Sequence, residues 1–168
     1  LDPKNPNRIY AAVSGDLFIP GGQRGLYVSN DRGDHWSRIL APPNDTTGAV
    51  DVAIDPKNPD RVLTAMWDHL RFPDRRRYTG PGSGIWRSTD RGAHWTHLGV
   101  ANGLPPDSDA NGRIGVAIDP SNEVVASRLG RNTTPSGVVM LAGTETSTQA
   151  MAPLRSRPAE LIDRSSSR

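Results

Sequence analysis

Apolar residues occur along this chain in short runs, and turns rich in glycine, proline, asparagine and aspartate separate the runs. Segments such as residues 61–67 (RVLTAMW) and 84–88 (GIWRS) are rich in residues that favour β-strands. Helical periodicity is hard to find before residue 120. Glycine (17 residues) and proline (15 residues) are frequent enough to supply many turns. The pattern therefore predicts an all-β protein of short antiparallel strands.

Two short motifs recur in the same order. The turn sequence DPKNP occupies residues 2–6 and returns at 55–59, and a degraded copy, DPSN, lies at 119–122. A second motif, SNDRGDHW at residues 29–36, returns as STDRGAHW at 88–95. Repetition in a fixed order is the signature of repeat architectures. The sequence therefore predicts a repeated unit of supersecondary structure.

Each repeat is predicted to contain four strands, A to D. In the complete copy these strands are residues 48–54, 61–67, 84–88 and 94–98. The earlier copy keeps strands B, C and D, at residues 8–13, 25–29 and 35–39. The later copy supplies only strand A, at residues 112–118. One four-stranded antiparallel sheet per repeat is the pattern of a β-propeller blade, so we expect a fragment of a β-propeller.

The chain divides into four predicted segments: a partial blade at 1–40, a complete blade at 48–98, the first strand of a further blade at 112–122, and a low-order tail at 123–168. All nine Phe, Tyr and Trp residues precede residue 96, so the tail has none. Its Ser, Thr, Arg and Pro residues bury too little apolar surface to fold. Because the repeat stops in mid-blade, we interpret the tail as the product of a shifted reading frame. The alternative is a natural disordered tail.

The SxDxGxxW motif has the residues that a tight turn between strands C and D requires. Its aspartate can accept hydrogen bonds from turn N–H groups, whose burial without a partner costs about 1–3 kcal/mol. Its glycine suits a positive φ, and its tryptophan is expected to begin strand D and pack into the core. We predict structural rather than catalytic roles for the residues that define the two copies: Ser29, Asp31, Gly33, Trp36, Ser88, Asp90, Gly92 and Trp95.

These motifs resemble the Asp box of BNR-type β-propellers, and the resemblance covers residues 1 to about 122. That group includes xyloglucanase-like glycoside hydrolases, sialidases, sortilin-type receptors and photosystem assembly factors. The resemblance implies a glycoside-hydrolase-like propeller that is inactive as this chain stands. The alternative is a non-catalytic propeller that binds a protein or peptide. It also implies that further blades are partners of these, and it favours an extracellular or periplasmic location.

Antiparallel strand order sends the connections of a blade to two opposite edges. The DPKNP turns join strands A and B and the SxDxGxxW turns join strands C and D, so both motifs lie at one edge. The longer connections lie at the other edge, here called the loop edge, and comprise residues 14–23, 41–47, 68–83 and 99–111. Function concentrates in loops carried by a rigid scaffold. We therefore expect a carbohydrate or a protein or peptide ligand to bind at the loop edge.

The longest loop, residues 68–83, carries the densest set of polar and aromatic side chains. Arginines can hold a carboxylate or phosphate, and Tyr78 or Phe72 can stack on a sugar ring. In the alternative that we favour, Asp68 and Asp74 simply pair with neighbouring arginines in a solvated loop. The candidate binding residues are Asp68, His69, Arg71, Arg75, Arg76, Arg77 and Tyr78.

The sequence does not single out a catalytic pair. Most glycosidases need two carboxylates roughly 5–9.5 Å apart, and sialidases add an arginine triad and a tyrosine whose context is missing here. The acidic residues at the loop edge are Asp16, Asp45, Asp68, Asp74, Asp107 and Asp109. None of them is marked out as a pair, so the catalytic residues stay unassigned.

Composition narrows the remaining classes of function. The chain has 168 residues and no cysteine, which excludes disulfides and thiolate metal sites. Two of its four histidines occupy repeat positions, so we expect no metal and no cofactor. A net charge of +2 without a long basic run argues against a nucleic-acid partner. No apolar stretch approaches the ~20 residues of a membrane helix.

Overall fold

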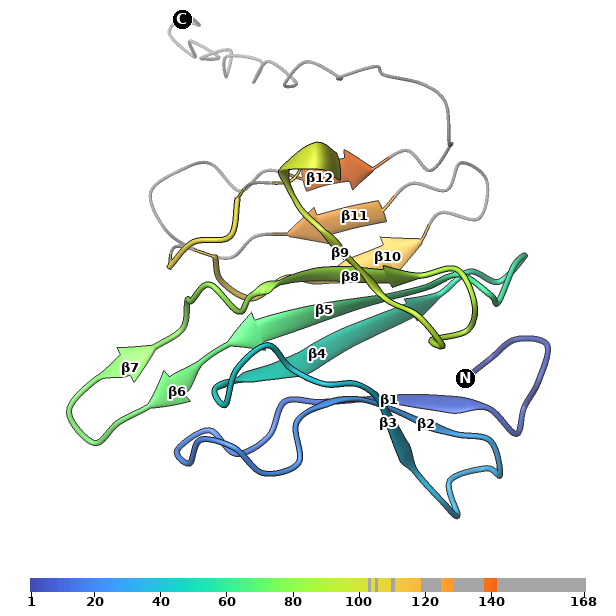
Figure 1. The fold of residues 1–168 in the computed structure, drawn as a ribbon, viewed down its shortest axis with the longest axis horizontal. Coiled ribbons are helices and arrows are strands. Elements are labelled where there is room, and N and C mark those ends of the chain that lie inside the picture. The colour runs from blue at the N-terminus through green and yellow to red at the C-terminus, as the bar shows by residue number, and fades with distance from the viewer. Residues whose placement is uncertain (103, 105, 110, 119–124, 129–137, 142–168) are drawn as a thin grey trace, which may run out of the picture.

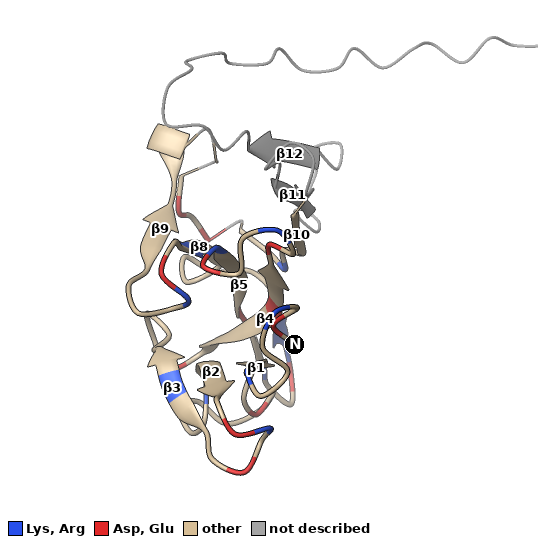
Figure 2. Ribbon diagram, turned by 90° about the vertical axis from the view of Figure 1, so that its right-hand side faces the viewer, with Lys and Arg blue, Asp and Glu red and all other residues tan. Residues whose placement is uncertain are grey.

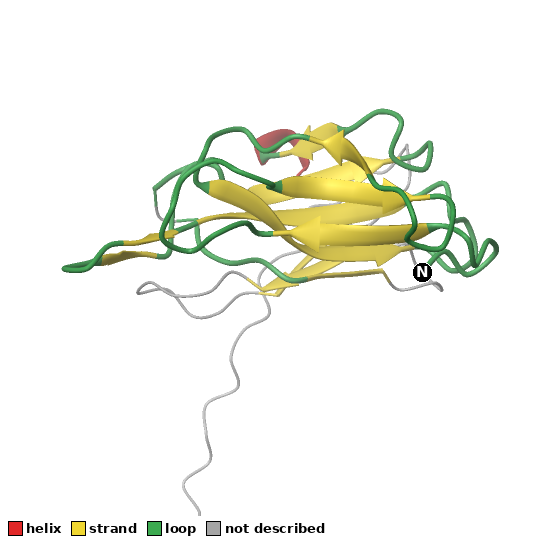
Figure 3. Ribbon diagram, turned by 90° about the horizontal axis from the view of Figure 1, so that it is seen from below, coloured by secondary structure: helices red, strands yellow, loops and turns green. Residues whose placement is uncertain are grey.

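The computed structural model describes residues 1–102, 104, 106–109, 111–118, 125–128 and 138–141. This part of the chain is all-β with antiparallel sheets, as the sequence predicts. Its one helical element is a short 3₁₀ turn, η1 (Val100–Asn102), among strands and loops (Figure 3). The rest of the predicted low-order tail lies outside the described residues.

Three sheets follow one another along the chain (Figure 1). The first contains, in spatial order, β1 (Ile9–Val13), β2 (Gly25–Ser29) and β3 (Ser37–Leu40). The second contains β4 (Thr47–Ile54), β5 (Val62–Asp68), β8 (Gly84–Ser88) and β9 (Thr96–Leu98). Between β5 and β8 the chain forms a separate small hairpin, β6 (Leu70–Arg71) and β7 (Arg76–Arg77).

The third sheet contains β10 (Val116–Ile118), β11 (Val125–Arg128) and β12 (Val138–Leu141). β10 begins at residue 116 rather than at the predicted 112. It also pairs with β11, and β11 pairs with β12. Strand pairing therefore extends past residue 122, into the segment for which composition predicts low order.

Both faces of the second sheet are covered by neighbouring elements. One core lies between the first and second sheets, and its buried members are Tyr10, Leu26, Val28, Ala49 and Val62. The other core lies between the second sheet and β10, and its buried members are Leu63, Ala65, Ile85, Leu98, Leu104, Ile114 and Val116. Successive residues of β5 thus enter different cores, because strand side chains alternate in direction. Figure 2 shows the sheets following one another, with charged residues mostly in turns and loops.

The two repeated motifs meet at one edge of the sheets, as antiparallel order predicts. The backbone N–H of Arg32 donates to Asn7 O at 3.0 Å, and that of Arg91 donates to Asp60 O at 2.9 Å. In each pair, one residue belongs to an SxDxGxxW turn and the other lies at or next to a DPKNP turn. Tyr10 Oη donates to Arg91 O at 3.0 Å, which ties the first sheet to the second at this edge.

Both SxDxGxxW turns share one hydrogen-bond pattern. In the second turn, Ser88 Oγ accepts from Gly92 N (2.7 Å) and donates to Asp90 Oδ1 (2.8 Å), which also accepts from His94 N (2.8 Å). The first turn repeats these contacts at equivalent positions. Both motif glycines have positive φ, 107° and 93°. The serine hydroxyl and the aspartate carboxylate therefore both accept hydrogen bonds from backbone N–H groups of the turn. The sequence predicts this role for the aspartate alone.

One expectation for these turns is wrong. Strand D begins at Ser37 and Thr96, so neither motif tryptophan starts a strand. Each indole N–H instead donates to the carbonyl of the motif glycine within the turn. Trp95 still packs against the core between the first two sheets, whereas Trp36 is 43% exposed. The hydrogen bond orients the ring, and the neighbouring elements decide whether it is buried.

The two-sided core predicts a strong effect of truncating Ile85, which is 1% exposed. Ile85→Ala removes buried methyl and methylene groups and leaves a cavity, so the free energy of unfolding should fall by about 2–5 kcal/mol. Urea denaturation followed by circular dichroism measures this. Ile19→Ala, at a position 64% exposed, is the matched control and should change stability by less than about 0.5 kcal/mol. Equal effects of the two substitutions would contradict the assigned core.

The turn carboxylates predict a pH dependence of stability. The His94 backbone N–H, the His94 ring and the Ser88 hydroxyl lower the pKa of Asp90 from 3.8 to about 2. A folded-state pKa below the unfolded one stabilises the fold above pH 4, and this contribution is lost as the pH falls toward 2.

Asp90→Asn should therefore lower the melting temperature at pH 6, with a difference from the unsubstituted chain that shrinks between pH 4 and pH 2. Thermal melts across this range measure the difference. Asp34→Asn, at an exposed position in the first turn, is the control and should show no such trend. A difference for Asp90→Asn that stays constant down to pH 2 would rule out the carboxylate as the cause.

Candidate ligand-binding site at the loop edge

Backbone hydrogen bonds join the four loops of the loop edge into one surface. The donor and acceptor pairs are Gly21 N and Asp45 O (2.7 Å), His69 N and Thr46 O (3.1 Å), Arg71 N and Leu17 O (2.8 Å), and Gly80 N and Asn111 O (2.9 Å). These loops leave different sheets. A ligand at this edge would therefore contact residues that are far apart in the sequence.

Arg24, which the sequence analysis did not select, holds the first two loops together. Its buried guanidinium donates only to backbone carbonyls, those of Ser14 (2.6 Å), Ile19 (3.0 Å), Gly21 (2.9 Å), Thr46 (3.4 Å) and Asp16. Burial lowers the pKa of this group. A Cβ at Gly15 would lie 2.4 Å from Arg24 Cγ, so the loop requires glycine there. The glycines on either side of this loop were the only feature of the sequence that could have indicated close packing around Arg24.

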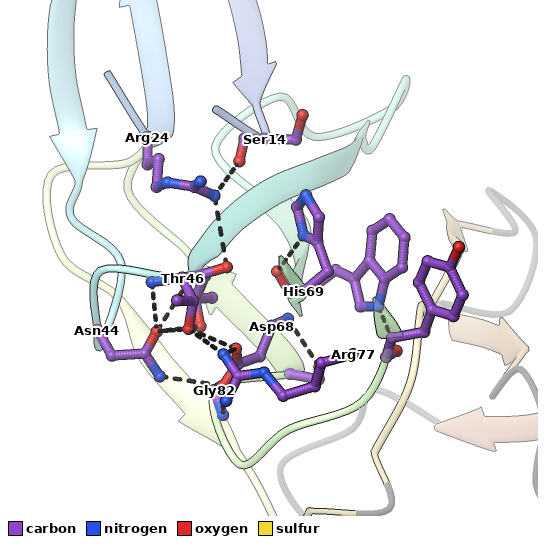
Figure 4. Close-up of polar contacts among 12 residues, drawn as sticks. Ser14, Arg24, Asn44, Thr46, Asp68, His69, Arg77 and Gly82 are labelled. Atoms are coloured by element: carbon purple, nitrogen blue, oxygen red, sulfur yellow. Dashed lines mark hydrogen bonds and ion pairs between the residues drawn. The ribbon is translucent and has the colours of Figure 1, made fainter. Parts of the chain in front are cut away.

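Asp68 is the centre of a second polar network (Figure 4). Its side chain is buried, with only 1% of its surface exposed to solvent. The carboxylate accepts hydrogen bonds from Thr46 Oγ1 (2.6 Å), Arg77 Nη2 (2.8 Å), Asn44 Nδ2 (3.1 Å) and Gly82 N (3.3 Å). These contacts join the second loop to the third. Asp68 is therefore a structural residue of the loop edge.

The ion pairs of the long loop correspond to the alternative that the sequence analysis favoured. Asp68 pairs with Arg77 at 2.8 Å, and Asp74 pairs with Arg75 at 3.6 Å. The second pair is fully on the surface, since both side chains are about 70% exposed. The first pair is different, because its aspartate is buried and fixes two loops.

An aromatic stack lies beside this network. The rings of Trp67 and His69 are stacked 4.1 Å apart, and those of Trp67 and Tyr78 are stacked 6.1 Å apart. Trp67 Nε1 also donates to Tyr78 O at 2.6 Å. Trp67 was missed as a candidate because it belongs to a predicted strand. Its position directly before the longest loop was the signal that pointed to a site.

His69 is buried within this stack. Its Nδ1 lies 3.1 Å from Trp67 O, and burial lowers the pKa of the ring, which favours the neutral form. In the neutral tautomer that donates from Nδ1, the other nitrogen is an acceptor. That atom, Nε2, is buried without a hydrogen-bond partner among the described residues.

The arginines of the loop edge are divided between the aromatic rings and the aspartates. The Arg71 guanidinium lies 5.9 Å from the Tyr78 ring centroid, and that of Arg113 lies 5.9 Å from the Trp67 ring centroid. Arg75 lies 4.4 Å from the Phe72 ring, within the β6–β7 hairpin that also contains exposed Arg76. Arg113 was missed because it precedes the next sheet in the sequence and only folding brings it to Trp67.

The remaining acidic candidates have local roles where the structure gives them contacts. Asp16 Oδ1 accepts from the backbone N–H groups of Phe18 (2.6 Å) and Ile19 (3.1 Å). Asp107 lies 3.5 Å from His97 Nε2. Within the described part of the chain, no group of three or more His, Cys, Asp or Glu residues could hold a metal ion. No helix in that part is long and apolar enough to cross a membrane.

Two sequence comparisons connect this arrangement with known proteins. Over 132 residues the chain is 30% identical to a probable oligoxyloglucan-reducing end-specific xyloglucanase of Neosartorya fischeri, which covers 73% of this chain and 14% of that protein. Over 108 residues it is 32% identical to xyloglucanase Xgh74A of Acetivibrio thermocellus, covering 58% and 11%. These homologues are xyloglucanases. No protein-family model matches the chain.

A solved structure shows the same fold. The GH74 xyloglucanase of Xanthomonas campestris superposes with a TM-score of 0.51 and 24% identity, over 77% of this chain and 16% of that one. The chain is therefore an all-β segment of the propeller type found in xyloglucanases. It spans only 14% and 11% of the lengths of its two curated relatives. A shared fold over so short a span does not establish a shared activity.

The buried network predicts that Asp68→Asn destabilises the chain. The substitution removes the charge that Arg77 pairs with and places an amide N–H₂ among hydrogen-bond donors, so we expect a loss of about 2–4 kcal/mol. Asp74→Asn is the matched control, and because its ion pair is exposed the loss should stay below about 0.5 kcal/mol. Urea denaturation of both variants measures this. Similar stabilities for the two would show that the network does not support the loop edge.

Proposed function

We propose that the loop edge binds a carbohydrate chain, within a propeller related to the glycoside hydrolases. The observation that carries this proposal is the stack of Trp67 and Tyr78, with Tyr78 38% exposed, at the edge where loops of neighbouring sheets meet. Flat aromatic rings with a polar tip suit the apolar face and hydroxyl rim of a sugar. The similarity to xyloglucanases supports the same class of ligand.

The proposal extends to the repeat family and to the blades. The shared Ser–Asp–Gly hydrogen bonds of the two SxDxGxxW turns support assignment to the Asp-box propellers. On that assignment residues 1–40 and 48–98 are blade segments, and a further blade starts within residues 112–122. The three sheets, formed by β1–β3, by β4, β5, β8 and β9, and by β10–β12, support this division.

The proposal does not include catalysis by this chain alone. Hydrolysis of a glycosidic bond needs two carboxyl groups free to act on opposite sides of it. Asp68 is occupied by four donors, Asp74 and Asp107 have basic partners, and Asp16 caps a turn. We therefore assign no catalytic pair to this chain and limit the proposal to glycan binding.

A second candidate function is binding of a protein or peptide. Phe18 and Ile19 lie side by side in the first loop and are 61% and 64% exposed. Exposed apolar residues of this size are suited to a protein partner. This surface is separate in sequence from the aromatic stack, so the two functions can be tested with different variants.

Isothermal titration calorimetry with a xyloglucan heptasaccharide tests the main proposal. Tyr78→Ala removes one stacking ring and should weaken binding about tenfold, which corresponds to about 1.4 kcal/mol. Trp36→Ala removes an exposed ring at the opposite edge and is the control, which should leave the affinity unchanged. A reducing-end assay of the same mixtures should show no hydrolysis. Absence of binding, or equal losses in both variants, would contradict the proposal.

A further inference from the structure

Two arginines beside the aromatic stack, Arg71 and Arg113, have no acidic partner among the described residues. Arg75 and Arg77 pair with Asp74 and Asp68. None of the ion pairs among the described residues involves Arg71, Arg76 or Arg113. Arg71 and Arg113 therefore place positive charge beside Tyr78 and Trp67 that no ion pair among the described residues balances. A neutral sugar would not compensate this charge.

Two of these arginines flank the same pair of rings from different loops. The Arg71 guanidinium lies 5.9 Å from the ring centroid of Tyr78, and that of Arg113 lies 5.9 Å from the ring centroid of Trp67. The bond from Gly80 N to Asn111 O (2.9 Å) holds the two loops together. Arg113 is exposed and Arg71 is half-buried, and neither guanidinium donates a hydrogen bond to another described residue.

Two buried nitrogen atoms at this place lack partners among the described residues. One is Arg71 Nε and the other is His69 Nε2. A buried donor without an acceptor is costly, and more so when it belongs to a charged group. A carboxylate is the acceptor that a guanidinium binds best, because its two oxygens match the planar fork.

We propose that Trp67, Tyr78, Arg71 and Arg113 form a subsite for a uronic acid residue of an acidic glycan. The rings contact the face of the sugar and the arginines bind its carboxylate. This inference rests on the proposed carbohydrate function and names the substrate class. It predicts a preference for sugars with a carboxylate, a charged group that a neutral xyloglucan chain does not have.

The test compares two oligosaccharides that differ in one group, using the full 168-residue chain. The first is xylotriose bearing one 4-O-methylglucuronic acid, and the second is the same compound with its carboxyl group reduced to the alcohol. Calorimetry at low ionic strength should show at least tenfold tighter binding of the acid. This advantage should shrink several-fold in 0.5 M NaCl, about the salt range in which exposed charge pairs are screened.

Substitutions then assign the preference to residues. Arg113→Gln and Arg71→Gln should each weaken binding of the acid at least fivefold and change binding of the reduced compound less than twofold. Arg87→Gln is the matched control, because Arg87 is exposed on β8 and outside the loop edge. It should change neither affinity. If Arg71→Gln fails to fold, Arg113→Gln and the two ligands still decide the question.

Each contrary result has a separate meaning. Equal affinities for the acid and the reduced compound would overturn the uronate subsite and leave the carbohydrate function intact. Failure of both compounds and of the xyloglucan heptasaccharide to bind would overturn the carbohydrate function and the subsite together. A triglutamate peptide that binds as tightly as the acidic sugar would also overturn the subsite, because the arginines would then attract any anion.

Discussion

The burial of the second sheet on both faces is the constraint on which the rest of this structure depends. β5 must place apolar side chains on both sides, and Val62 and Leu63 accordingly enter different cores. A sheet with one exposed face would leave one of these cores in water, at a cost of about 25 cal/mol per Å² of apolar surface. The sheets therefore stack in series, and this stacking places equivalent edges of successive sheets beside one another.

The two edges created in this way are stabilised by different chemistry. At the edge of the repeated turns, short-range hydrogen bonds within each motif stabilise the turns, and the two copies have the same pattern. At the loop edge, long-range contacts dominate. Arg24 binds carbonyls of two loops, and Asp68 accepts donors from two loops. Local turns can repeat along a chain, whereas each long-range clamp is specific to its own loop.

This division supports the proposal that the loop edge is the place for recognition. The clamps hold Asp68 and Arg24 in structural roles, and the residues left over are rings and cations: Trp67, Tyr78, Arg71 and Arg113. Rings and cations of this kind are suited to the binding role that we propose. The similarity to xyloglucanases and the aromatic rings at this edge both support the proposed carbohydrate ligand. The proposed preference for an acidic sugar rests on the arginines and not on the similarity.

The sequence by itself determined the all-β class, the positions of most strands and the edge to which each motif belongs, because alternation, turn residues and repeats act over short distances. Antiparallel order then required DPKNP and SxDxGxxW turns to share an edge. The site was only partly predictable. Tyr78, His69 and Arg71 could be selected from one loop, and the pairing of Asp68 and Asp74 with nearby arginines followed from their proximity.

Only the tertiary structure decided the remainder. The positions of Arg24, Trp67 and Arg113 depend on contacts between segments far apart in the chain, which no local pattern encodes. The two motif tryptophans show the same limit. Their turns are alike, yet Trp36 is exposed and Trp95 packs into a core, because only the second turn has a neighbouring sheet over its ring. Short-range sequence patterns determine how a turn is built, and packing between sheets determines what its side chains contact.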